Sequence, residues 1–252
     1  MPYLVNFMQN DGIILENLTL TYERHPAVHH LSGQFPRGSS TAIIGPNGGG
    51  KSTLLKSLAG LHPIDEGNIL RGQTHDLINT AYLPQNTQWD KVFPLTVFEL
   101  ASQALVTTPR FWWRLDSEQK KQVQLALEQV NLWEQRSLTI EQLSLGQFQR
   151  ALFARIIVQN AQVILLDEPL KGLDEPSIKD FFQLIHLWQR QNKTLIVVLH
   201  DRNHIRQHFE NTLWLAKEAL AWGPTVDVLD RDIWPSSPQR SPLFSSEEEC
   251  LR

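Results

Sequence analysis

The sequence predicts an α/β fold: a parallel-sheet core with an antiparallel, β-rich N-terminal portion and an inserted helical segment. Two continuous apolar runs, residues 163–167 (VILLD) and 194–200 (TLIVVLH), are of the kind that is buried on both faces of a parallel sheet. A helical pattern around residues 177–191 lies between the two runs. Together the three segments make a βαβ unit, whose strands run parallel.

Short strands are predicted in the first third of the chain. Three β-type runs are separated by Pro, Arg and Gly residues: 18–22 (LTLTY), 29–35 (HHLSGQF) and 40–45 (STAIIG). A helix over 52–59 follows and ends at Gly60. The next two runs, 68–72 (NILRG) and 80–84 (TAYLP), are predicted to be a strand pair.

Helical periodicity then interrupts the core for roughly 70 residues. The first helix covers residues 96–105 (TVFELASQAL), and a longer one begins near Asp116. The apolar face of the longer helix carries Val123, Leu127 and Val130. A third helix begins in the stretch LSLGQ and ends near Gln159.

Composition and charge exclude several classes of protein. The chain has 252 residues and a net charge of −4, which argues against a nucleic-acid-binding surface. Its longest apolar runs fall far short of the roughly 20 residues of a transmembrane helix, and the N-terminus lacks a signal-peptide pattern. The single Cys250 fits a reducing compartment. We therefore expect a cytoplasmic protein that can still dock on a membrane protein, with a disordered tail after Pro235.

The segment 45–53 (GPNGGGKST) predicts a phosphate-binding loop. It satisfies the spacing G-x-x-x-x-G-K-[ST] and lies between a predicted strand and a predicted helix, which a chance Gly-rich turn would not require. Glycines let successive backbone N–H groups face phosphate oxygens. Lys51 supplies a cation for the β- and γ-phosphates, and the Ser52 hydroxyl can ligate Mg²⁺. The candidate nucleotide-binding residues are Gly45, Pro46, Asn47, Gly48, Gly49, Gly50, Lys51, Ser52 and Thr53.

Two acidic residues end the apolar run VILLDEP (163–169). Acids at the carboxyl end of a parallel strand face the crevice in which such sheets bind ligands. Asp167 is placed to support Mg²⁺, and Glu168 is placed to polarise a water molecule for attack on the γ-phosphate. A solvated acidic loop is the alternative. With the phosphate-binding loop, the pair indicates a P-loop NTPase.

Gln85 and His200 each follow a predicted core strand. Alone, either residue is ordinary loop chemistry. Together, both could reach the crevice that holds Lys51 and Glu168. Gln85 could then sense Mg²⁺ or the attacking water, and His200 could hydrogen-bond the γ-phosphate.

The stretch LSLGQFQR (143–150) has two interpretations. Ser144 and Gln147 have the spacing of a capping box, and apolar residues of helical period follow them. The start of a helix also binds anions, because its free N–H groups and its dipole point outward. The segment alone does not distinguish a helix cap from half of a nucleotide site.

Taken in order, Tyr22, GPNGGGKST, Gln85, LSLGQ, VILLDEP, GLD (172–174) and His200 resemble the motif series of ABC-type ATPases, over nearly the whole chain. The resemblance implies the ABC-ATPase version of the P-loop NTPase fold: a RecA-like parallel-sheet core with an N-terminal antiparallel β-subdomain and an inserted helical subdomain. It implies one ATPase domain over 12–234. The core and β-subdomain would occupy 12–86 and 160–234, the helical subdomain 87–159, and a tail 235–252.

The resemblance also assigns roles to individual residues. It implies ATP and Mg²⁺ as cofactors, with Ser52, Gln85 and Asp167 at the metal and Glu168, Gln85 and His200 in hydrolysis. In this family the signature helix of one subunit caps the γ-phosphate held by the other, which implies a homodimer. The signature residues here would be Ser144, Gly146 and Gln147.

Leu145 departs from the family pattern LSGGQ, so its side chain must point away from the nucleotide. Tyr22 resembles the aromatic residue that stacks on adenine. A strand-end tyrosine that fills the sheet edge is an equal alternative.

The stretch 82–100 (YLPQNTQWDKVFPLTVFEL) resembles the ATP-binding subunits of zinc and manganese uptake transporters. The implied partners are integral-membrane permease subunits, a substrate-binding protein indirectly, and no nucleic acid. The implied location is peripheral, on the inner face of the cell membrane. Alternatives are an importer of another cargo such as an iron-siderophore, a soluble non-transport ABC ATPase, or a P-loop kinase of small metabolites.

His200, His204 and His208 have the spacing that aligns metal ligands on a helix. His200 belongs at a strand end, so only the other two remain. The sequence favours a solvated face over a regulatory metal site on His204 and His208.

Overall fold

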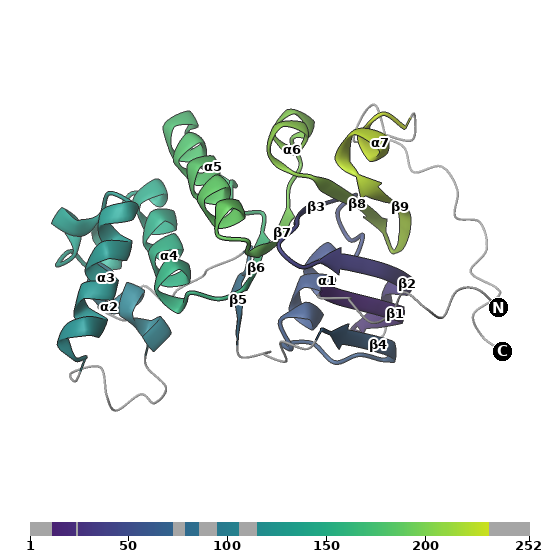
Figure 1. Ribbon diagram of the computed structural model, residues 1–252, viewed down its shortest axis with the longest axis horizontal. Helices are drawn as coiled ribbons and strands as arrows, with labels where there is room; N and C mark the ends of the chain where they lie inside the picture. Colours follow the sequence, from purple (N-terminus) through teal and green to yellow (C-terminus); the bar gives the residue numbers. More distant parts are fainter. Residues whose placement is uncertain (1–11, 24, 73–78, 86–94, 106–114, 232–252) are drawn as a thin grey trace.

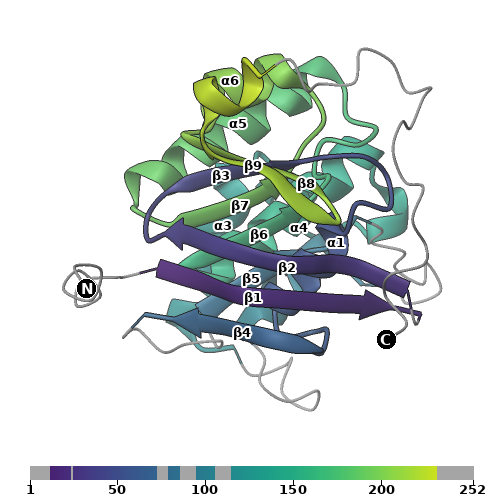
Figure 2. The same ribbon diagram turned by 90° about the vertical axis from the view of Figure 1, so that its right-hand side faces the viewer.

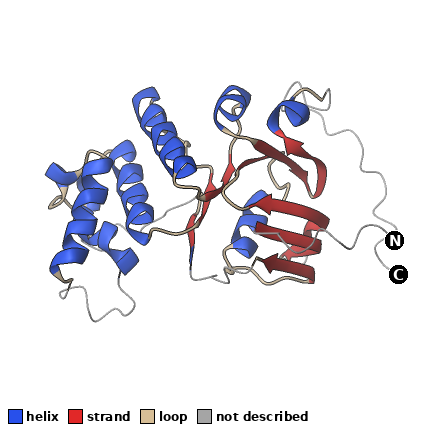
Figure 3. Ribbon diagram, viewed as in Figure 1, coloured by secondary structure: helices blue, strands red, loops and turns tan. Residues whose placement is uncertain are grey.

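The computed structural model describes residues 12–23, 25–72, 79–85, 95–105 and 115–231, which form two sheets and a set of helices (Figures 1 and 3). The strands are β1 (Gly12–Tyr22), β2 (His25–Pro36), β3 (Ser40–Ile44), β4 (Glu66–Arg71), β5 (Thr80–Leu83), β6 (Val163–Asp167), β7 (Thr194–Val198), β8 (Asn211–Ala216) and β9 (Glu218–Pro224). The α-helices are α1 (Lys51–Leu58), α2 (Val97–Ser102), α3 (Ser117–Gln129), α4 (Leu145–Gln159), α5 (Glu175–Arg190), α6 (Arg202–His208) and α7 (Thr225–Leu229). The predicted tail 235–252 lies outside the described residues.

A six-stranded sheet in the order β5-β6-β7-β3-β8-β9 lies at the centre of the molecule. Strands β5, β6, β7, β3 and β8 pair in parallel, and β9 runs antiparallel to β8. Every residue of β3 and β7 is buried, which explains why these strands are uninterrupted apolar runs in the sequence. The predicted parallel core is confirmed.

A second, three-stranded antiparallel sheet in the order β2-β1-β4 lies beside the first (Figure 2). The predicted pairing of the runs 68–72 and 80–84 is wrong, because β4 pairs with β1 and β5 pairs with β6. The two strands have different surroundings. β4 is an exposed edge strand, whereas Ala81 and Leu83 of β5 are buried in the main core. Closeness in sequence does not decide pairing when the burial of the strands differs.

Helices α2, α3 and α4 pack together at the end of the molecule farthest from the three-stranded sheet (Figure 1). α2 and α3 begin close to the predicted positions, and Thr96 and Asp116 each form a capping box there. The predicted apolar face is confirmed, since Val123, Leu127 and Val130 are buried. The boundaries of the helical subdomain at 87 and 159 stay a prediction. Among the described helices, none is long and apolar enough to cross a membrane.

Alternate residues of the central strands face two different hydrophobic clusters. Ala42 and Ile44 of β3 lie in the cluster that holds α4 and α5, and Ile43 lies in the cluster that holds α1 and the three-stranded sheet. Phe35 of β2 packs on Trp222 of β9 with ring centroids 4.7 Å apart, so this contact joins the two sheets. The central sheet therefore holds α1, and the loop before it, against a buried apolar layer.

Replacing Phe35 with Ala should destabilise the protein by about 3–5 kcal/mol, because a fully buried ring is lost between the sheets and leaves a cavity. Urea unfolding followed by tryptophan fluorescence measures this free energy. Leu220→Ala is the matched control, because Leu220 of β9 is 44% exposed and its loss should change stability by less than about 0.5 kcal/mol. Equal losses of unfolding free energy in the two variants would contradict the role of Phe35 in holding the two sheets together.

Candidate nucleotide-binding site

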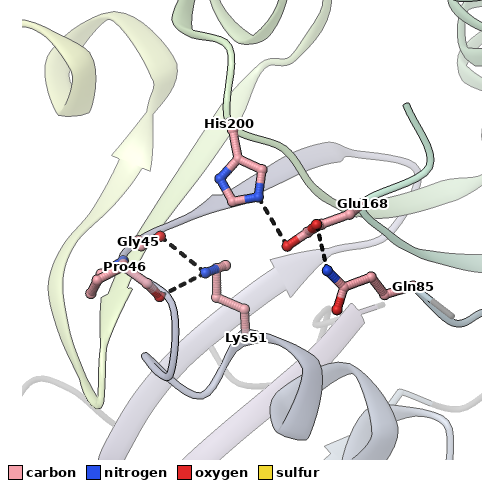
Figure 4. Close-up of polar contacts among 6 residues, drawn as sticks. All are labelled: Gly45, Pro46, Lys51, Gln85, Glu168 and His200. Atoms are coloured by element: carbon pink, nitrogen blue, oxygen red, sulfur yellow. Dashed lines mark hydrogen bonds and ion pairs between the residues drawn. The ribbon is translucent and has the colours of Figure 1, made fainter. Parts of the chain in front are cut away.

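Four parallel strands end at the same edge of the central sheet, and a polar side chain or a glycine loop follows each end. Gly45 follows β3, Gln85 comes after β5, Asp167 ends β6, and His200 comes after β7. Because carboxyl ends of parallel strands share one edge, these residues converge in space. Figure 4 shows Gly45, Gln85 and His200 at this edge, together with Lys51 and Glu168. The convergence that the sequence predicted for Lys51, Glu168, Gln85 and His200 is present.

The loop from Gly45 to Gly50 needs glycine at two positions for different contacts. A Cβ on Gly45 (φ 148°) would lie 1.8 Å from the Leu215 carbonyl oxygen, and one on Gly50 (φ 88°) would lie 2.1 Å from that of Ala27. Only a residue without a side chain fits between these backbones. Gly50 is also the N-cap of α1, so the loop delivers the chain directly into the first turn of that helix.

Lys51 is enclosed by this loop. Its Nζ donates hydrogen bonds to the carbonyl oxygens of Gly45 at 2.9 Å and Pro46 at 2.8 Å (Figure 4), and the residue is only 6% exposed. Burial lowers the pKa of Lys51, and the charges of Glu168 and Asp167 oppose this shift. Nearby carboxylates and backbone carbonyls thus favour the charged ammonium at the centre of the site.

The Asp167 carboxylate and the Ser52 hydroxyl lie next to each other and are joined by a hydrogen bond. Asp167 is 2% exposed, and its Oδ1 is buried without a hydrogen-bond partner. Burial raises the pKa of Asp167, while a hydrogen bond from the Ser52 side chain and the charge of Lys51 favour ionisation. A buried, unsatisfied carboxylate oxygen beside a hydroxyl suits a hard divalent cation such as Mg²⁺. These residues fit a magnesium ion.

Glu168 adopts a left-handed backbone conformation (φ 50°) directly after β6. Its Oε1 lies 3.0 Å from Nε2 of His200, and its Oε2 accepts a hydrogen bond from the Gln85 side-chain amide at 2.6 Å (Figure 4). Burial favours the neutral acid, but hydrogen bonds and charge from His200, together with the Gln85 amide, outweigh it. The pKa of Glu168 therefore lies below its usual value. The carboxylate is ionised and held between two side chains.

These groups line one open hollow of about 720 Å³. Lys51, Ser52, Gln85, Glu168, His200 and Tyr22 all border it. Tyr22 is 49% exposed, with Nζ of Lys56 5.8 Å from its ring centre and the His62 ring stacked at 6.4 Å. The ring stands at the end of β1 and is half-open to the hollow, so it does not fill the sheet edge.

The predicted signature residues lie elsewhere. Ser144, Gly146 and Gln147 do not border the hollow. The Ser144 hydroxyl accepts from the Gln147 N–H at 3.2 Å, and the Gln147 side chain accepts from the Ser144 N–H at 2.9 Å, which is a complete capping box at the start of α4. Leu145 is 57% exposed, and its side chain lies next to Gly172.

Two lysines that the sequence did not single out as ligands also border the hollow, Lys171 and Lys217. The Lys217 N–H donates to the Gly49 carbonyl at 3.1 Å, so this residue also fixes the loop. Lys217 lies between β8 and β9 with φ 65°. Nothing in its local sequence distinguishes it from an ordinary turn lysine.

Comparison with known proteins agrees with this geometry. Residues 28–171 match the model of the ABC transporter family. The chain is 35% identical to a manganese transport system ATP-binding protein of Listeria monocytogenes, over 86% of this chain and 92% of the relative. It is 33% identical to a zinc transport system ATP-binding protein of Treponema pallidum, over 88% and 84% of the two chains.

A solved structure of a dimeric bacterial ABC transporter cassette is also similar. It superposes with a TM-score of 0.70 at 25% identity and covers 84% of this chain and 98% of the cassette. The family match spans more than half of the chain, and both relatives span most of it. The chain therefore belongs to the ABC transporter family as one of its ATP-binding, ATP-hydrolysing components.

Proposed function

We propose that this chain is the ATP-hydrolysing subunit of an ABC importer for a divalent metal ion, zinc or manganese. The observation that carries the cargo class is the similarity to both a manganese and a zinc transport ATPase along nearly the whole chain. The ATPase does not itself touch the cargo in this proposal. It supplies the free energy, and its own site chemistry is the same for any cargo.

ATP binds in the hollow with its phosphates on the loop 45–53. Lys51 is buried and charged, so it offsets the charge of the β- and γ-phosphates when its contacts to the Gly45 and Pro46 carbonyls are exchanged for phosphate oxygens. The N-terminus of α1 adds backbone N–H groups that favour an anion. Tyr22, half-exposed at the rim, offers a flat surface on which adenine stacks.

A magnesium ion would be held by the Ser52 hydroxyl and by Asp167, with Gln85 beside them. When bound, the metal neutralises charge that develops on the phosphate oxygens. The unsatisfied Oδ1 of Asp167 supports this assignment, because a buried carboxylate oxygen without a donor is costly unless a cation or water meets it.

Glu168 is the general base in this proposal. Its ionised carboxylate accepts a proton from the attacking water, and His200 and Gln85 hold it in one orientation. The His200 side chain is 53% exposed, so it can also reach a phosphate oxygen. Gln85, hydrogen-bonded to Glu168, is placed to sense Mg²⁺ or the attacking water.

The second half of each site comes from a second copy of the chain. Ser144, Gly146 and Gln147 lie outside the hollow of their own subunit, which leaves them available to the γ-phosphate held by a partner subunit. The similar bacterial cassette is a dimer. Leu145 is compatible with this role, because its side chain lies beside Gly172.

In the transporter, the dimer sits on the cytoplasmic face of the membrane against two permease subunits. A substrate-binding protein acts on the other side. The helical subdomain, 87–159, and the core with its β-subdomain, 12–86 and 160–234, would move relative to each other during the cycle. Family membership removes the P-loop kinase alternative. An iron-siderophore importer and a soluble ABC ATPase remain the rivals.

Glu168→Gln should lower the rate of ATP hydrolysis by a factor on the order of 10²–10⁴, because the amide cannot accept a proton. ATP binding should survive. The closed ATP-bound dimer should then accumulate. Size-exclusion chromatography with Mg-ATP should give a dimer for this variant and mostly monomer for the parent chain. Glu210→Gln, at a glutamate that does not border the hollow and contacts Ser40 at the start of β3, is the control and should behave as the parent. A variant that turns over at the parental rate would refute the role of Glu168.

Ser144→Arg should prevent dimer closure, because a bulky cation would lie over the γ-phosphate of the partner subunit. In the Glu168→Gln background, a mixed dimer of Ser144→Arg and Lys51→Ala chains would keep one whole site and retain one ATP. Each single-variant homodimer should retain none. Retention of ATP by the Ser144→Arg homodimer would mean that LSLGQ is only a helix cap.

The cargo assignment is tested by transport. The chain, its permease and its binding protein should be reconstituted in vesicles, and uptake of Zn²⁺, Mn²⁺ and an iron-siderophore measured with ATP present. ATP-dependent uptake of zinc or manganese is expected, and the Glu168→Gln chain should abolish it. Siderophore uptake alone would identify the rival importer, and no association with any permease would favour a soluble ATPase.

A further inference from the structure

A pair of histidines outside the nucleotide hollow faces each other between two helices. Nδ1 of His208, at the end of α6, lies 3.0 Å from Nε2 of His186 on α5. For His204 and His208 the sequence favoured a solvated face over a metal site, and their two rings are stacked with centroids 6.2 Å apart. Residue spacing along one helix could not predict the pairing with His186, because His186 lies on another helix. The histidine pair seen in the structure, His186 and His208, therefore bridges two helices, α5 and α6.

The hydrogen bonds around the pair fix which nitrogen carries a proton. The side-chain amide nitrogen of Gln189 donates to the Ser40 hydroxyl at 3.0 Å and to the His208 carbonyl at 2.8 Å. Its amide oxygen therefore accepts from Nδ1 of His186, at 2.9 Å. Nε2 of His186 is therefore unprotonated and accepts a hydrogen bond from Nδ1 of His208, which is the donor between the two rings.

The pair lies in a partly buried, aromatic setting. The Phe182 ring stacks on His208 at 3.9 Å with an interplanar angle of 15°, and it contacts His204 at 4.7 Å. Burial lowers the pKa of His208, and the nearby His186 and His204 add to the shift. A neutral imidazole is the form that binds a metal ion.

We propose that Nε2 of His186 and Nδ1 of His208 form a two-histidine site for a divalent transition metal. On binding, the Nδ1 proton of His208 moves to its own Nε2 through solvent, so both facing nitrogens present lone pairs and no net proton is released. Bond lengths of about 2.0–2.1 Å in a tetrahedral site separate two nitrogens by roughly 3.3 Å, so the pair needs to widen by only about 0.3 Å. Gln189 orients the His186 ring as an outer-shell partner.

Zinc is the expected ion among the two candidate cargoes. Imidazole nitrogens suit Zn²⁺, whereas Mn²⁺ prefers oxygen ligands and binds nitrogen sites more weakly. Within the described part of the chain, no three His, Cys, Asp or Glu side chains converge on one metal position. Water would complete the coordination, which makes the site open and reversible.

Occupancy would tie α5 to α6. These helices begin just after the segment 172–174 and just after His200, and Gln189 extends the connection to Ser40 at the start of β3. The pair does not border the nucleotide hollow. Zinc binding at this site would therefore act through α5 and α6 and not at the nucleotide hollow. It does not depend on which cargo the transporter carries.

The test is zinc binding to the full chain without tag and without nucleotide, by equilibrium dialysis, with thermal unfolding followed in parallel. Zn²⁺ should bind more tightly than Mn²⁺ and raise the melting temperature by a few degrees. His186→Gln and His208→Gln should each weaken this zinc binding by about tenfold or more and remove the thermal shift. Both variants should melt close to the parent chain when zinc is absent.

Two control variants test whether zinc binding is specific to His186 and His208. His30→Gln alters another neighbouring pair, His29 and His30, whose ring centroids lie 6.1 Å apart, and should leave zinc binding unchanged. His204→Gln should also retain it. Zinc affinity that is unchanged in His186→Gln, or lost in His204→Gln while His186→Gln keeps it, would overturn the bridging site. These outcomes do not depend on ATP hydrolysis or transport.

Discussion

The parallel pairing of β6, β7 and β3 is the constraint on which the nucleotide site depends. Asp167 of β6 and Ile43 of β3 both lie in register with Val198 of β7, so the three strands end at one level of the sheet. The loop of Lys51, the carboxylates after β6 and His200 must therefore emerge side by side. Apolar burial on both faces of these strands fixes that register, because a slip of one residue would exchange the two clusters.

The charged side chains at this edge of the sheet influence one another's pKa values. Lys51 would be costly to bury alone, but it lies among backbone carbonyls and near two carboxylates. Asp167 and Glu168 respond in opposite directions. The deeper Asp167 has a raised pKa and an unsatisfied oxygen, whereas Glu168 is kept ionised by His200 and Gln85. Adjacent acids in sequence thus acquire different chemistry from different surroundings. Asp167 presents an unsatisfied oxygen that suits a cation, and Glu168 is kept in its ionised form.

The start of α4 carries a local motif in the same residues for which we propose an intermolecular role. Ser144 and Gln147 satisfy each other as a capping box within one chain. Only two N–H groups are used by this exchange, and a helix start leaves others free. A phosphate from another subunit can therefore approach the helix without competing with the fold of this chain.

Local patterns in the sequence predicted most of the elements and indicated the segment that we propose as the phosphate loop. Period, caps and glycine spacing depend on residues within one or two turns of each other, as at Asp116 and along GPNGGGKST. Membership of Glu168, Gln85 and His200 in one crevice was also predictable, because each follows a buried strand. The partners of β4 and β5 were not predictable in this way, and neither was the role of Lys217 at the loop.

Only the tertiary structure decided contacts between segments far apart in the chain. Gln85 reaches Glu168 across 83 positions, and His186 meets His208 across 22. Such contacts depend on strand order and on which face of each helix is buried, and these are set by packing of the whole core. The sequence by itself specified which residues could do chemistry, and the tertiary structure decided which of them meet, because side chains must lie within a few ångströms to share a proton or a metal ion.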